Sequence, residues 1–487
     1  MALTELGTRP PRKRPPPDAA RSMFPDVAGR RRRRRTAGLV MASAVGGLLV
    51  VVALWLTGGG IQGFHEVGGP ATEIGRLSGL VASYLLLIQV LLMARIPWLE
   101  GIWGQDVLAR QHRLAGFGSF HLMLVHIVAI VLGYAAAAQS GVLKELWLLV
   151  TGYPGMLLAT AGTMALVAVV VTSIRAARRT MRYESWHLIH LYAYLGVALA
   201  LPHQLWTGAD FTASPVATVF WWGLWAVSAA ALVCWRIVTP LVRSARHRIR
   251  VLAVVPESRD VVSIVMSGNR LDRLGLQAGQ FCQWRFLGRP GWTRAHPFTV
   301  SAVPTGDRLR ITVRATGDGT RALAALRPGG AVVVEGPYGI MNAARRDRRD
   351  VLLIAAGVGV TTMRGLAEAV LAEPASTGPG GIRRPSVVLL HRIRSRPDAL
   401  FAPEFAQLAR TGDLRGYSLL GPRSTGSGWW GGKNRLDPAA EVTRLVPDVA
   451  DREVYVCGPA PWMTQVQQTL QQLGVPRTAI HAEEFSW

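Results

Sequence analysis

The chain has 487 residues, enough for about three domains of ordinary size, and half of these residues are hydrophobic. Its net charge of +24 would suit a nucleic-acid-binding protein. The arginines cluster beside long apolar runs, however, as they do at the cytoplasmic ends of membrane helices, so we expect a lipid bilayer as partner and no nucleic acid. The three cysteines, Cys234, Cys282 and Cys457, are too scattered for a four-thiolate iron–sulfur cluster or a CxxC site. Any bound metal must therefore use histidine.

The N-terminal half predicts a disordered tail and a membrane domain. Residues 1–36 are rich in proline and arginine and are expected to form a basic tail that touches acidic lipid. Residues 37–240 hold six apolar stretches, each close to the roughly 20 residues that a membrane helix needs. These stretches are 37–57, 74–96, 112–134, 154–174, 187–206 and 216–239. A soluble helical bundle is the alternative, but stretches this apolar argue against it.

Arginine is distributed unequally between the loops that join these stretches. It is dense before the first span, between the fourth and fifth, and after the sixth, whereas the loops at 58–73, 135–153 and 207–215 contain no arginine and a single lysine, Lys144. The positive-inside rule therefore predicts a multi-pass protein of the plasma membrane with both termini in the cytoplasm. The soluble C-terminal half is then cytoplasmic too, where NAD(P)H is found.

Two predicted spans carry histidines at matched depths. His112 and His126 lie on the third span, 14 residues apart, and an ideal helix returns them to within about 40° of one face. His190 and His203 lie on the fifth span, 13 residues apart, which an ideal helix would separate by about 140°; Pro202 could rotate the helix end. Such histidines could bind two stacked haems as paired imidazoles. Interhelical hydrogen bonds or a metal-transport path remain alternatives, and His187 is an alternative ligand to His190.

These residues resemble a known family. His112-Arg113 at the start of one span, His126 at its end, and the run 183–190 leading to His203 are similar to the ferric reductase / NADPH oxidase superfamily. The resemblance implies two b-type haems, one bound by His112 and His190 and the other by His126 and His203. It favours His190 over His187.

Residues 247–340 predict a small antiparallel β-barrel. Short alternating strands with turns between them are expected at 248–255, 261–266, 280–286, 309–315 and 331–335. The motif His296-Pro297-Phe298-Thr299 lies among them and resembles the flavin motif of the oxidase branch of the same superfamily. The resemblance implies that this barrel binds FAD.

The roles of individual residues follow from that resemblance. Phe298 would pack against the isoalloxazine ring, Thr299 would hydrogen-bond near its N5, and His296 would lie toward the FAD phosphates. Arg314 and Thr320 match the family's Arg-x-x-Gly-Asp-Trp-Thr run and are plausible pyrophosphate ligands. Gly319 stands where that run has tryptophan, so an aromatic contact is lost.

Residues 348–487 predict an α/β domain with a parallel sheet. An apolar strand at 351–356 is followed by Gly357-Val358-Gly359 and by a helix from about Thr361, which together form an anion site for a pyrophosphate. Two further strands are expected at 386–391 and 453–457, and the second ends at Cys457-Gly458-Pro459, on the sheet edge where ligands bind. The order of these pieces resembles the ferredoxin–NADP reductase module, with Thr362 in place of the usual proline. A buried small side chain is the other interpretation of Cys457.

Two features bear on the coenzyme. Arg392, Arg394 and Arg396 follow a strand at a point where a 2′-phosphate could bind, which favours NADPH over NADH; a solvated basic loop is the alternative. The chain ends in Trp487, at the end of an alternating segment 481–487 that predicts a final strand. The family has a C-terminal aromatic over the flavin face, so Trp487, or less favourably Phe485, would cover the flavin. Core packing is the alternative.

The sequence therefore predicts a membrane all-α six-helix bundle (37–240), an antiparallel β-barrel FAD domain (247–340) and an α/β parallel-sheet nucleotide-binding domain (348–487). Electrons would pass from NAD(P)H through FAD and two haems to an outer acceptor. Ferric iron is the favoured acceptor because no oxidase regulatory segment is recognised, and oxygen is the second. Thr299, Cys457 and Trp487 are the expected catalytic residues. A membrane transporter or receptor that only senses redox cofactors is the alternative outside enzymes.

Overall fold

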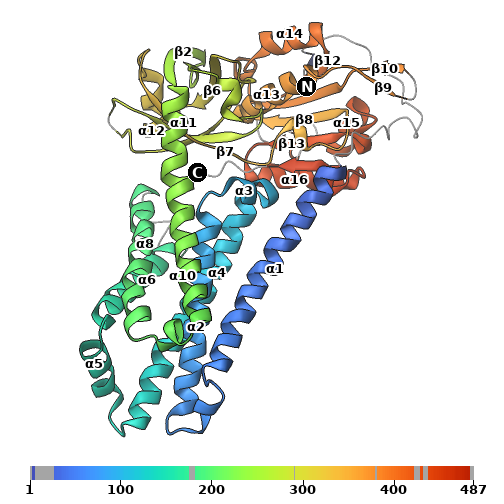
Figure 1. Cartoon of the computed structure of the whole chain (residues 1–487). Coiled ribbons are helices and arrows are strands. Elements are labelled where there is room, and N and C mark those ends of the chain that lie inside the picture. Colours follow the sequence, from blue (N-terminus) through green and yellow to red (C-terminus); the bar gives the residue numbers. More distant parts are fainter. Residues whose placement is uncertain are drawn as a thin grey trace. The chain divides into compact units, whose positions relative to one another are not determined.

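The computed structural model divides into two units, each described by itself (Figure 1). One is the helical bundle of Arg34–Ile102 and Asp106–Arg236, and the other contains Ile237–Trp487 together with Met1–Arg33 and Trp103–Gln105. The residues that the structure describes are 3–5, 27–174, 181, 183–289, 291–378, 381–421, 428–430 and 437–482.

Six of the described helices are long and apolar enough to cross a membrane, which confirms the six predicted spans. They are α1 (Val27–Thr57), α2 (Gly69–Met93), α4 (Gln105–Ala137), α6 (Met156–Ser173), α8 (Tyr183–Trp206) and α10 (Pro215–Leu232). The last continues through a π-helical turn at Val233–Val238 into α11 (Thr239–His247). Short helices in the connections are α3 (Pro97–Trp103), α5 (Val142–Gly152) and α9 (Ala209–Thr212).

The helix ends differ from the predicted spans because polar residues can extend a helix beyond its apolar part. Helix α1 begins at Val27, inside the segment assigned to the tail, since arginine is a good helix former. Helix α10 begins at Pro215, and the Ser214 side chain caps it by accepting a hydrogen bond of 3.1 Å from the Ala217 N–H. Apolar hydropathy thus places a span, while capping residues set its ends.

Helices α6 and α8 pack closely through two glycines. A Cβ placed on Gly162 would lie 2.7 Å from the Gly196 carbonyl oxygen, and one placed on Gly196 would lie 3.0 Å from the Gly162 carbonyl oxygen. Side chains at these positions would push the two backbones apart, as at other small-residue contacts between membrane helices.

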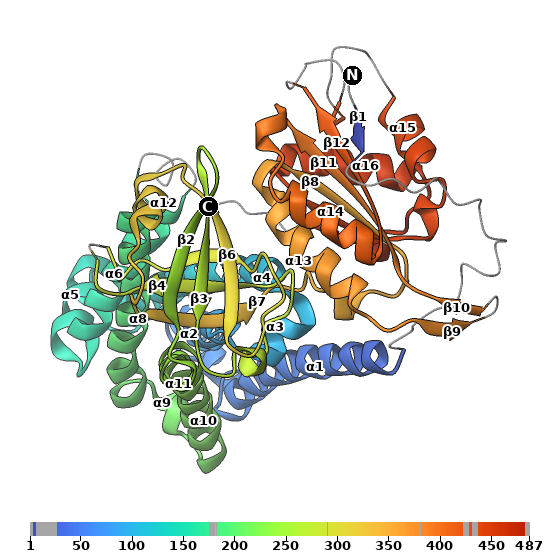
Figure 2. The same cartoon turned by 90° about the horizontal axis from the view of Figure 1, so that it is seen from above.

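Residues 250–338 form the predicted antiparallel barrel from two three-stranded sheets. In the first, β2 (Arg250–Ser258), β3 (Val261–Ser267) and β6 (Arg308–Arg314) pair in that order (Figure 2). The second sheet has the order β5-β4-β7, with β5 at His296–Thr299, β4 at Phe281–Phe286 and β7 at Val332–Tyr338. Single bridges from Arg250 to Ala331 and from Val300 to Ile311 join the two sheets. The short helix α12 (Asp318–Arg321) follows β6.

Residues 351–482 contain a parallel sheet in the order β12-β11-β8-β13-β14, as predicted for the nucleotide-binding part. Figure 2 shows β12, β11 and β8 side by side. The strands of the sheet are β8 (Val351–Ala356), β11 (Ser386–Ile393), β12 (Asp413–Leu420), β13 (Glu453–Cys457) and β14 (Ile480–Ala482). Strand β1 (Leu3–Glu5), from the segment assigned to the tail, adds to β12 in the antiparallel direction. A separate hairpin joins β9 (Ser376–Gly378) and β10 (Gly381–Arg383).

Helices cover both faces of this sheet because its strands are apolar on both sides. Helices α13 (Val360–Leu371) and α14 (Ala402–Thr411) pack on one face, against residues such as Leu353 of β8. Helices α15 (Pro438–Leu445) and α16 (Ala460–Gln472) pack on the other, against residues such as Leu352.

Candidate redox site

Four histidines of the bundle form two pairs between α4 and α8. The ring centroids of His112 and His190 are 6.1 Å apart, and those of His126 and His203 are also 6.1 Å apart. The two α4 residues are 14 positions apart, which corresponds to a rise of about 21 Å along a helix. The bundle therefore holds two imidazole pairs of equal separation at two levels.

Carbonyl groups of α2 fix the tautomer of the two α4 histidines. The Nδ1 atom of His112 lies 3.1 Å from the Gln89 carbonyl oxygen, and that of His126 lies 2.8 Å from the Gly75 carbonyl oxygen. A carbonyl only accepts, so Nδ1 carries the proton and Nε2 keeps the lone pair that binds a metal. The two acceptors are 14 residues apart on α2, as the histidines are on α4, so one helix orients both rings.

Glycines let α2 approach His126. A Cβ on Gly79 would lie 2.5 Å from the His126 Nδ1 atom, and one on Gly75 would lie 2.8 Å from the Ile130 side chain. Gly75 and Gly79 share one face of α2 because they are one helical turn apart. A larger residue at either position would displace the carbonyl that orients His126.

The separation of each pair fits a metal ion held between two imidazoles. Bonds of about 2 Å from a metal to each of two imidazole nitrogens place the ring centroids about 6 Å apart, and both pairs have this separation. His187, the alternative ligand on α8, is exposed. A further histidine of α4, His121, lies within 2.7 Å of the Phe117 carbonyl of its own helix through Nδ1. No group of three or more His, Cys, Asp or Glu side chains suited to a metal occurs in the described ranges.

The two histidines of α8 are 13 residues apart in the sequence. His190 and His203 would lie about 140° apart on an ideal helix, yet each faces its partner on α4. Pro202 lies inside α8, directly before His203. Proline removes a backbone hydrogen bond and distorts the last turn of a helix, which is a physical reason for the changed direction of His203.

In the second unit, the flavin motif lies on β5. The rings of His296 and Phe298 are parallel, with centroids 5.8 Å apart and an interplanar angle of 3°. The Trp284 Nε1–H donates to the Phe298 carbonyl oxygen at 2.9 Å and fixes this strand. Pro297 lies between the two rings in sequence and cannot itself donate a backbone hydrogen bond. Strand β5 therefore presents Phe298 as a flat surface for a planar ligand.

The Thr299 hydroxyl is the clearest sign that this strand accepts a ligand. Thr299 is buried, and its Oγ1 atom has no hydrogen-bond partner within the described part of the chain. A buried hydroxyl without a partner is costly. An FAD ring that offered a polar atom there would remove this cost, so Thr299 fits the group that the sequence predicts.

Two arginines that the sequence interpretation missed surround His296. The Arg289 Nη2 atom donates to His296 Nε2 at 3.1 Å, and burial, with the charges of Arg289 and Arg294, lowers the pKa of His296 to about 4. His296 is therefore neutral at pH 7 and leaves a net positive site that suits a phosphate. The only sequence signal for a role of these arginines in the site is their position in the loop before the motif.

The Gly317–Thr320 turn lies beside this site. The Thr320 Oγ1 atom, within α12, accepts from the N–H of Gly317, the residue before that helix, at 3.0 Å. A Cβ on Gly319 would lie 3.3 Å from His296. The imidazole thus occupies space next to the position where the family has tryptophan. Arg314 pairs with Asp260 through an Nε–Oδ2 distance of 2.6 Å, and its Nη1 atom lies 3.8 Å from a Cβ placed on Gly357.

The glycine turn of the nucleotide-binding part requires its glycines. Gly357 has φ +56°, which favours glycine. A Cβ on Gly359 would lie 2.5 Å from the Cys457 carbonyl oxygen. Helix α13 begins directly after this turn, with Thr361 buried in its first turn, so its free N–H groups face the carboxyl edge of the sheet. Cys457 is fully buried at the end of β13.

Gly458 and Pro459 connect β13 to α16. A Cβ on Gly458 would lie 2.7 Å from the Trp462 ring, so the indole packs flat against the backbone there. Pro459 precedes the first residue of α16. The structure thus brings Gly357, Gly359 and Cys457 together at one edge of the sheet, where a dinucleotide binds in this fold class.

His391 is a further residue at this edge that the sequence interpretation missed. It is buried on β11, and its Nε2 atom lies 3.0 Å from the Gly357 carbonyl oxygen. Burial lowers the pKa of His391 to about 4, so the ring is neutral and donates its Nε2–H to that carbonyl. His391 therefore holds the first residue of the glycine turn in place.

The basic residues proposed for coenzyme selection differ in exposure. Arg392 is buried within β11, and its Nη1 atom donates to the carbonyl oxygens of Ile393 and Leu419 at 2.5 and 3.1 Å. Arg394 and Arg396 are exposed after the strand. Trp487 and Phe485 lie outside the residues that the structure describes.

Comparison with known proteins defines the class. Three family models match in sequence order: the ferric reductase like transmembrane component at residues 78–201, an FAD-binding domain at 246–342 and an oxidoreductase NAD-binding domain at 353–468. This chain therefore combines a membrane component like that of ferric reductases with an FAD-binding domain and an NAD-binding domain of oxidoreductases. It has the ferric reductase / NADPH oxidase type of architecture, which confirms the resemblance noted in the sequence.

Known relatives cover the chain in part. It is 32% identical over 250 residues to the ferredoxin reductase component of 3-ketosteroid-9-alpha-monooxygenase from Mycolicibacterium smegmatis, covering 49% of this chain and 65% of the relative. It is 27% identical over 248 residues to the glycine betaine monooxygenase reductase subunit of Chromohalobacter salexigens, covering 50% and 65%. Each match spans less than two thirds of the relative. The FAD/NAD-binding domain of nitric oxide dioxygenase from Vibrio cholerae aligns at 24% identity and TM-score 0.37, covering 49% of this chain and 99% of that domain.

Proposed function

We propose that this protein passes electrons from cytoplasmic NAD(P)H, through FAD and two stacked b-type haems, to an acceptor on the outer side of the membrane. One observation carries the proposal: two histidine pairs with the same 6.1 Å ring separation lie at two levels of one membrane bundle. We assign haem binding to residues 37–240, FAD binding to 247–340 and NAD(P) binding to 348–487, with 1–36 as a basic tail.

FAD, when bound, accepts the two electrons of a hydride and releases them singly to haem, which takes one at a time. The chain's own residues prepare this chemistry. His112 and His190 would hold the inner haem, and His126 and His203 the outer one. The Gln89 and Gly75 carbonyls keep Nδ1 of the α4 histidines protonated, so that the lone pair of Nε2 would be free to bind the iron.

The flavin residues would bind and orient FAD. Phe298 would pack on the isoalloxazine ring, and the Thr299 hydroxyl would donate to it near N5. His296, in its neutral form, would lie toward the phosphates, where Arg289 and Arg294 supply the positive charge. Arg314 and Thr320 would complete the pyrophosphate contacts.

The glycine turn would bind the coenzyme. The backbone of Gly357 and Gly359 and the N-terminus of α13 at Thr361 suit a pyrophosphate. Cys457, Gly458 and Pro459 would lie beside the nicotinamide. We favour NADPH over NADH because Arg392 and the arginines after it lie near the end of β11, where a 2′-phosphate would bind. Trp487 would cover the flavin until the coenzyme displaces it.

We place the protein in the plasma membrane with both termini in the cytoplasm. The support is the distribution of arginine, which is dense in the loops of one side and absent from 58–73, 135–153 and 207–215. This orientation puts the FAD and nucleotide residues on the side where NAD(P)H is found, and puts His126 and His203 near the outer surface.

Ferric iron is our favoured acceptor, with oxygen reduced to superoxide as the second candidate. The test is to reduce the purified protein with NADPH under argon and to follow haem absorbance after adding a ferric chelate or oxygen. Fast reoxidation by the chelate supports a ferric reductase, whereas fast reoxidation by oxygen alone supports an oxidase. A redox-sensing transporter or receptor would have no haem spectrum that responds to NADPH, and that result would contradict the proposal.

A further inference from the structure

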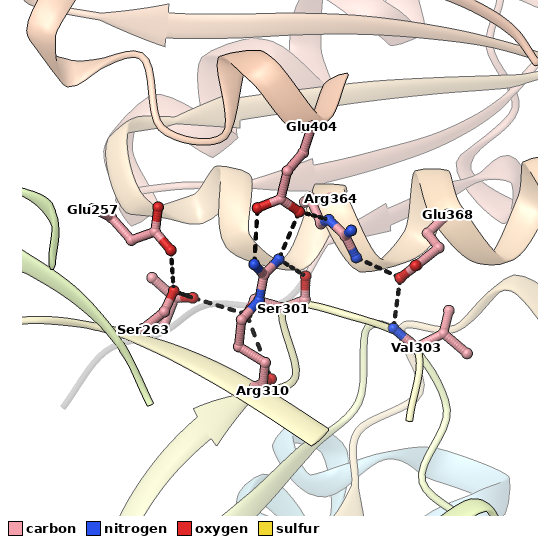
Figure 3. A network of polar contacts seen from close by, with 9 residues as sticks. Glu257, Ser263, Ser301, Val303, Arg310, Arg364, Glu368 and Glu404 are labelled. Atoms are coloured by element: carbon pink, nitrogen blue, oxygen red, sulfur yellow. Dashed lines mark hydrogen bonds and ion pairs between the residues drawn. The ribbon is translucent and has the colours of Figure 1, made fainter. Parts of the chain in front are cut away.

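An arginine of the barrel forms a two-point ion pair with a helix of the nucleotide-binding sheet. Arg310 lies on β6, and Glu404 lies on α14. The Arg310 Nη1 atom donates to Glu404 Oε1 at 2.8 Å, and Nη2 donates to Oε2 at 2.9 Å (Figure 3). Paired bonds of this kind fix direction as well as distance, so the Arg310–Glu404 pair fixes the position of α14 relative to β6.

A second arginine extends the contact to the helix that begins at the glycine turn. Arg364 of α13 pairs with the same Glu404, through an Nε–Oε2 distance of 2.6 Å, and also with Glu368 (Figure 3). The Glu368 Oε2 atom accepts from the Val303 N–H at 2.7 Å. Helix α13 is thereby tied to the segment that follows the flavin strand.

Arg310 holds that same segment from the barrel side. Its Nε atom donates to Ser301 Oγ at 3.1 Å, and its Nη2 atom also donates to the Ser301 carbonyl at 3.2 Å. Ser301 is fully buried, and the Thr312 hydroxyl donates to it at 2.8 Å. Because Ser301 is two residues after Thr299, a change in the Arg310 contacts would reach the flavin strand directly.

The backbones of the two parts are also in close contact here. A Cβ on Gly365 of α13 would lie 3.2 Å from the Val300 carbonyl oxygen. Residues 300–303 therefore lie against the helix whose N-terminus forms part of the coenzyme site, and the ion pairs surround this contact.

The charges of the four ion-paired side chains balance. Two arginines, Arg310 and Arg364, face two glutamates, Glu368 and Glu404, and all four side chains are at most 32% exposed. Burial raises the pKa of Glu404, but the hydrogen bond from Arg310 and the charge of Arg364 outweigh it, so the pKa lies below its ordinary value. The carboxylate stays ionised. The loss of one partner would leave another charge partly buried and unpaired.

We propose that Arg310 is a positioning residue that holds the flavin strand and the coenzyme helix in the register needed for hydride transfer, acting through Glu404 and Ser301. This inference rests on the proposed use of FAD and NAD(P)H. Arg310 itself touches neither the transferred hydride nor the cofactor sites described above. Its effect is geometric, and hydride transfer is sensitive to misplacement of about 1 Å.

The first test measures geometry without coenzyme, by hydrogen exchange of the full-length protein. Arg310→Lys keeps the charge but loses the two-point contact, and Glu404→Gln removes the charge from the other side. Both should raise the exchange rate of the Val303 amide about 10-fold. Strand β13, which lies outside the network, should not change. Arg308→Lys, an exposed change two residues away on the same strand, is the control. Equal exchange at Val303 in all variants, or an equal rise in β13, would overturn the proposal.

The second test measures flavin reduction by NADPH in stopped flow, at matched FAD content. Arg310→Lys and Glu404→Gln should each slow the limiting rate about 10-fold and increase the isotope effect with coenzyme deuterated at C4. The double variant should be no slower than either single variant, because both act through one contact. Normal limiting rates in both variants would overturn the inference alone. A wild-type flavin that NADPH does not reduce would overturn the proposed function as well.

Discussion

The ring centroids of His126 on α4 and His203 on α8 lie 6.1 Å apart. On an ideal helix, His203 would lie about 140° away from His190, the other paired histidine of α8. The His112–His190 pair repeats the distance at a second level of the bundle. Both ring separations are of the size expected for two imidazoles that would hold one metal ion between them, and they are the geometric basis of the haem proposal.

Replacement of one outer histidine should remove one haem. His126→Ala should lower the haem content from two to one per chain, because an iron with a single imidazole loses its second axial bond. Reduction of the remaining inner haem by NADPH should persist, since His112 and His190 are untouched. Haem content is measured from the pyridine haemochrome spectrum of the purified variant.

His121→Ala is the matched control, because His121 lies on the same helix and bonds to its own backbone at Phe117. It should keep both haems. Loss of a haem in the control, or two haems in His126→Ala, would contradict the assignment.

The Thr299 hydroxyl should contribute to flavin binding. Thr299→Val removes a buried hydroxyl that has no partner among the described residues and nearly preserves its volume. A lost hydrogen bond of about 1 kcal/mol should weaken FAD binding roughly 5-fold. Titration of flavin fluorescence measures the dissociation constant, with the exposed Thr305→Val as control. Unchanged or tighter binding would mean that Thr299 does not contact FAD.

His391 should make stability depend on pH. Its pKa is lowered to about 4 by burial, from 6.5 when exposed, so the folded state carries it without a proton. The free energy of unfolding is therefore highest well above pH 6.5. It decreases as the pH falls toward 4, because the unfolded chain binds a proton at His391 more tightly than the folded chain does. About 1.4 kcal/mol should be lost by pH 5.5.

His391→Gln should reduce this loss, since an amide can still donate to the Gly357 carbonyl but does not titrate in this range. The measurement is the difference in melting temperature between pH 7.5 and pH 5.5, for wild type and variant. An identical difference in both proteins would show that His391 does not set the pH dependence.

Coenzyme selection should depend on the arginines at the end of β11. Arg392→Ala should raise KM for NADPH more than KM for NADH if a 2′-phosphate binds there. Because Arg392 donates to the Ile393 and Leu419 carbonyls, the melting temperature must be compared as well. Arg394→Ala, an exposed change, separates phosphate binding from folding. Equal effects on both coenzymes in both variants would exclude a phosphate contact.

Trp487→Ala tests the proposed cover of the flavin. Removal of an indole that competes with nicotinamide should strengthen binding of both coenzymes and change the discrimination between them. Coenzyme affinity and steady-state kinetics are compared at full FAD loading. Unchanged affinity for both coenzymes would leave Trp487 as a packing residue.

The sequence predicts most of the architecture because most elements have a local signal. Hydropathy alone places the six spans, and strand β8 is found with the bounds Val351–Ala356 because an apolar run ends at a glycine turn. The short strand β1 has no such signal. It forms by pairing with β12, far along the chain, and local pattern cannot predict such a partner.

The candidate site is predictable only where a motif carries it. Helical spacing argues against pairing both His190 and His203 with α4, yet both pair with α4 histidines in the structure. Arg289 and His391 are recognised only once the fold brings them to His296 and Gly357. The Arg310–Glu404 pair joins residues 94 positions apart, so it depends on tertiary packing rather than on any local pattern.

The most direct test of the electron path is the haem content and NADPH response of the intact protein. Purified full-length protein, loaded with FAD and kept under argon, is mixed with NADPH while the haem absorbance is recorded. We predict two b-type haems per chain, both reduced by NADPH. A ratio of one haem per chain, or two haems that dithionite reduces and NADPH does not, would contradict the proposed path.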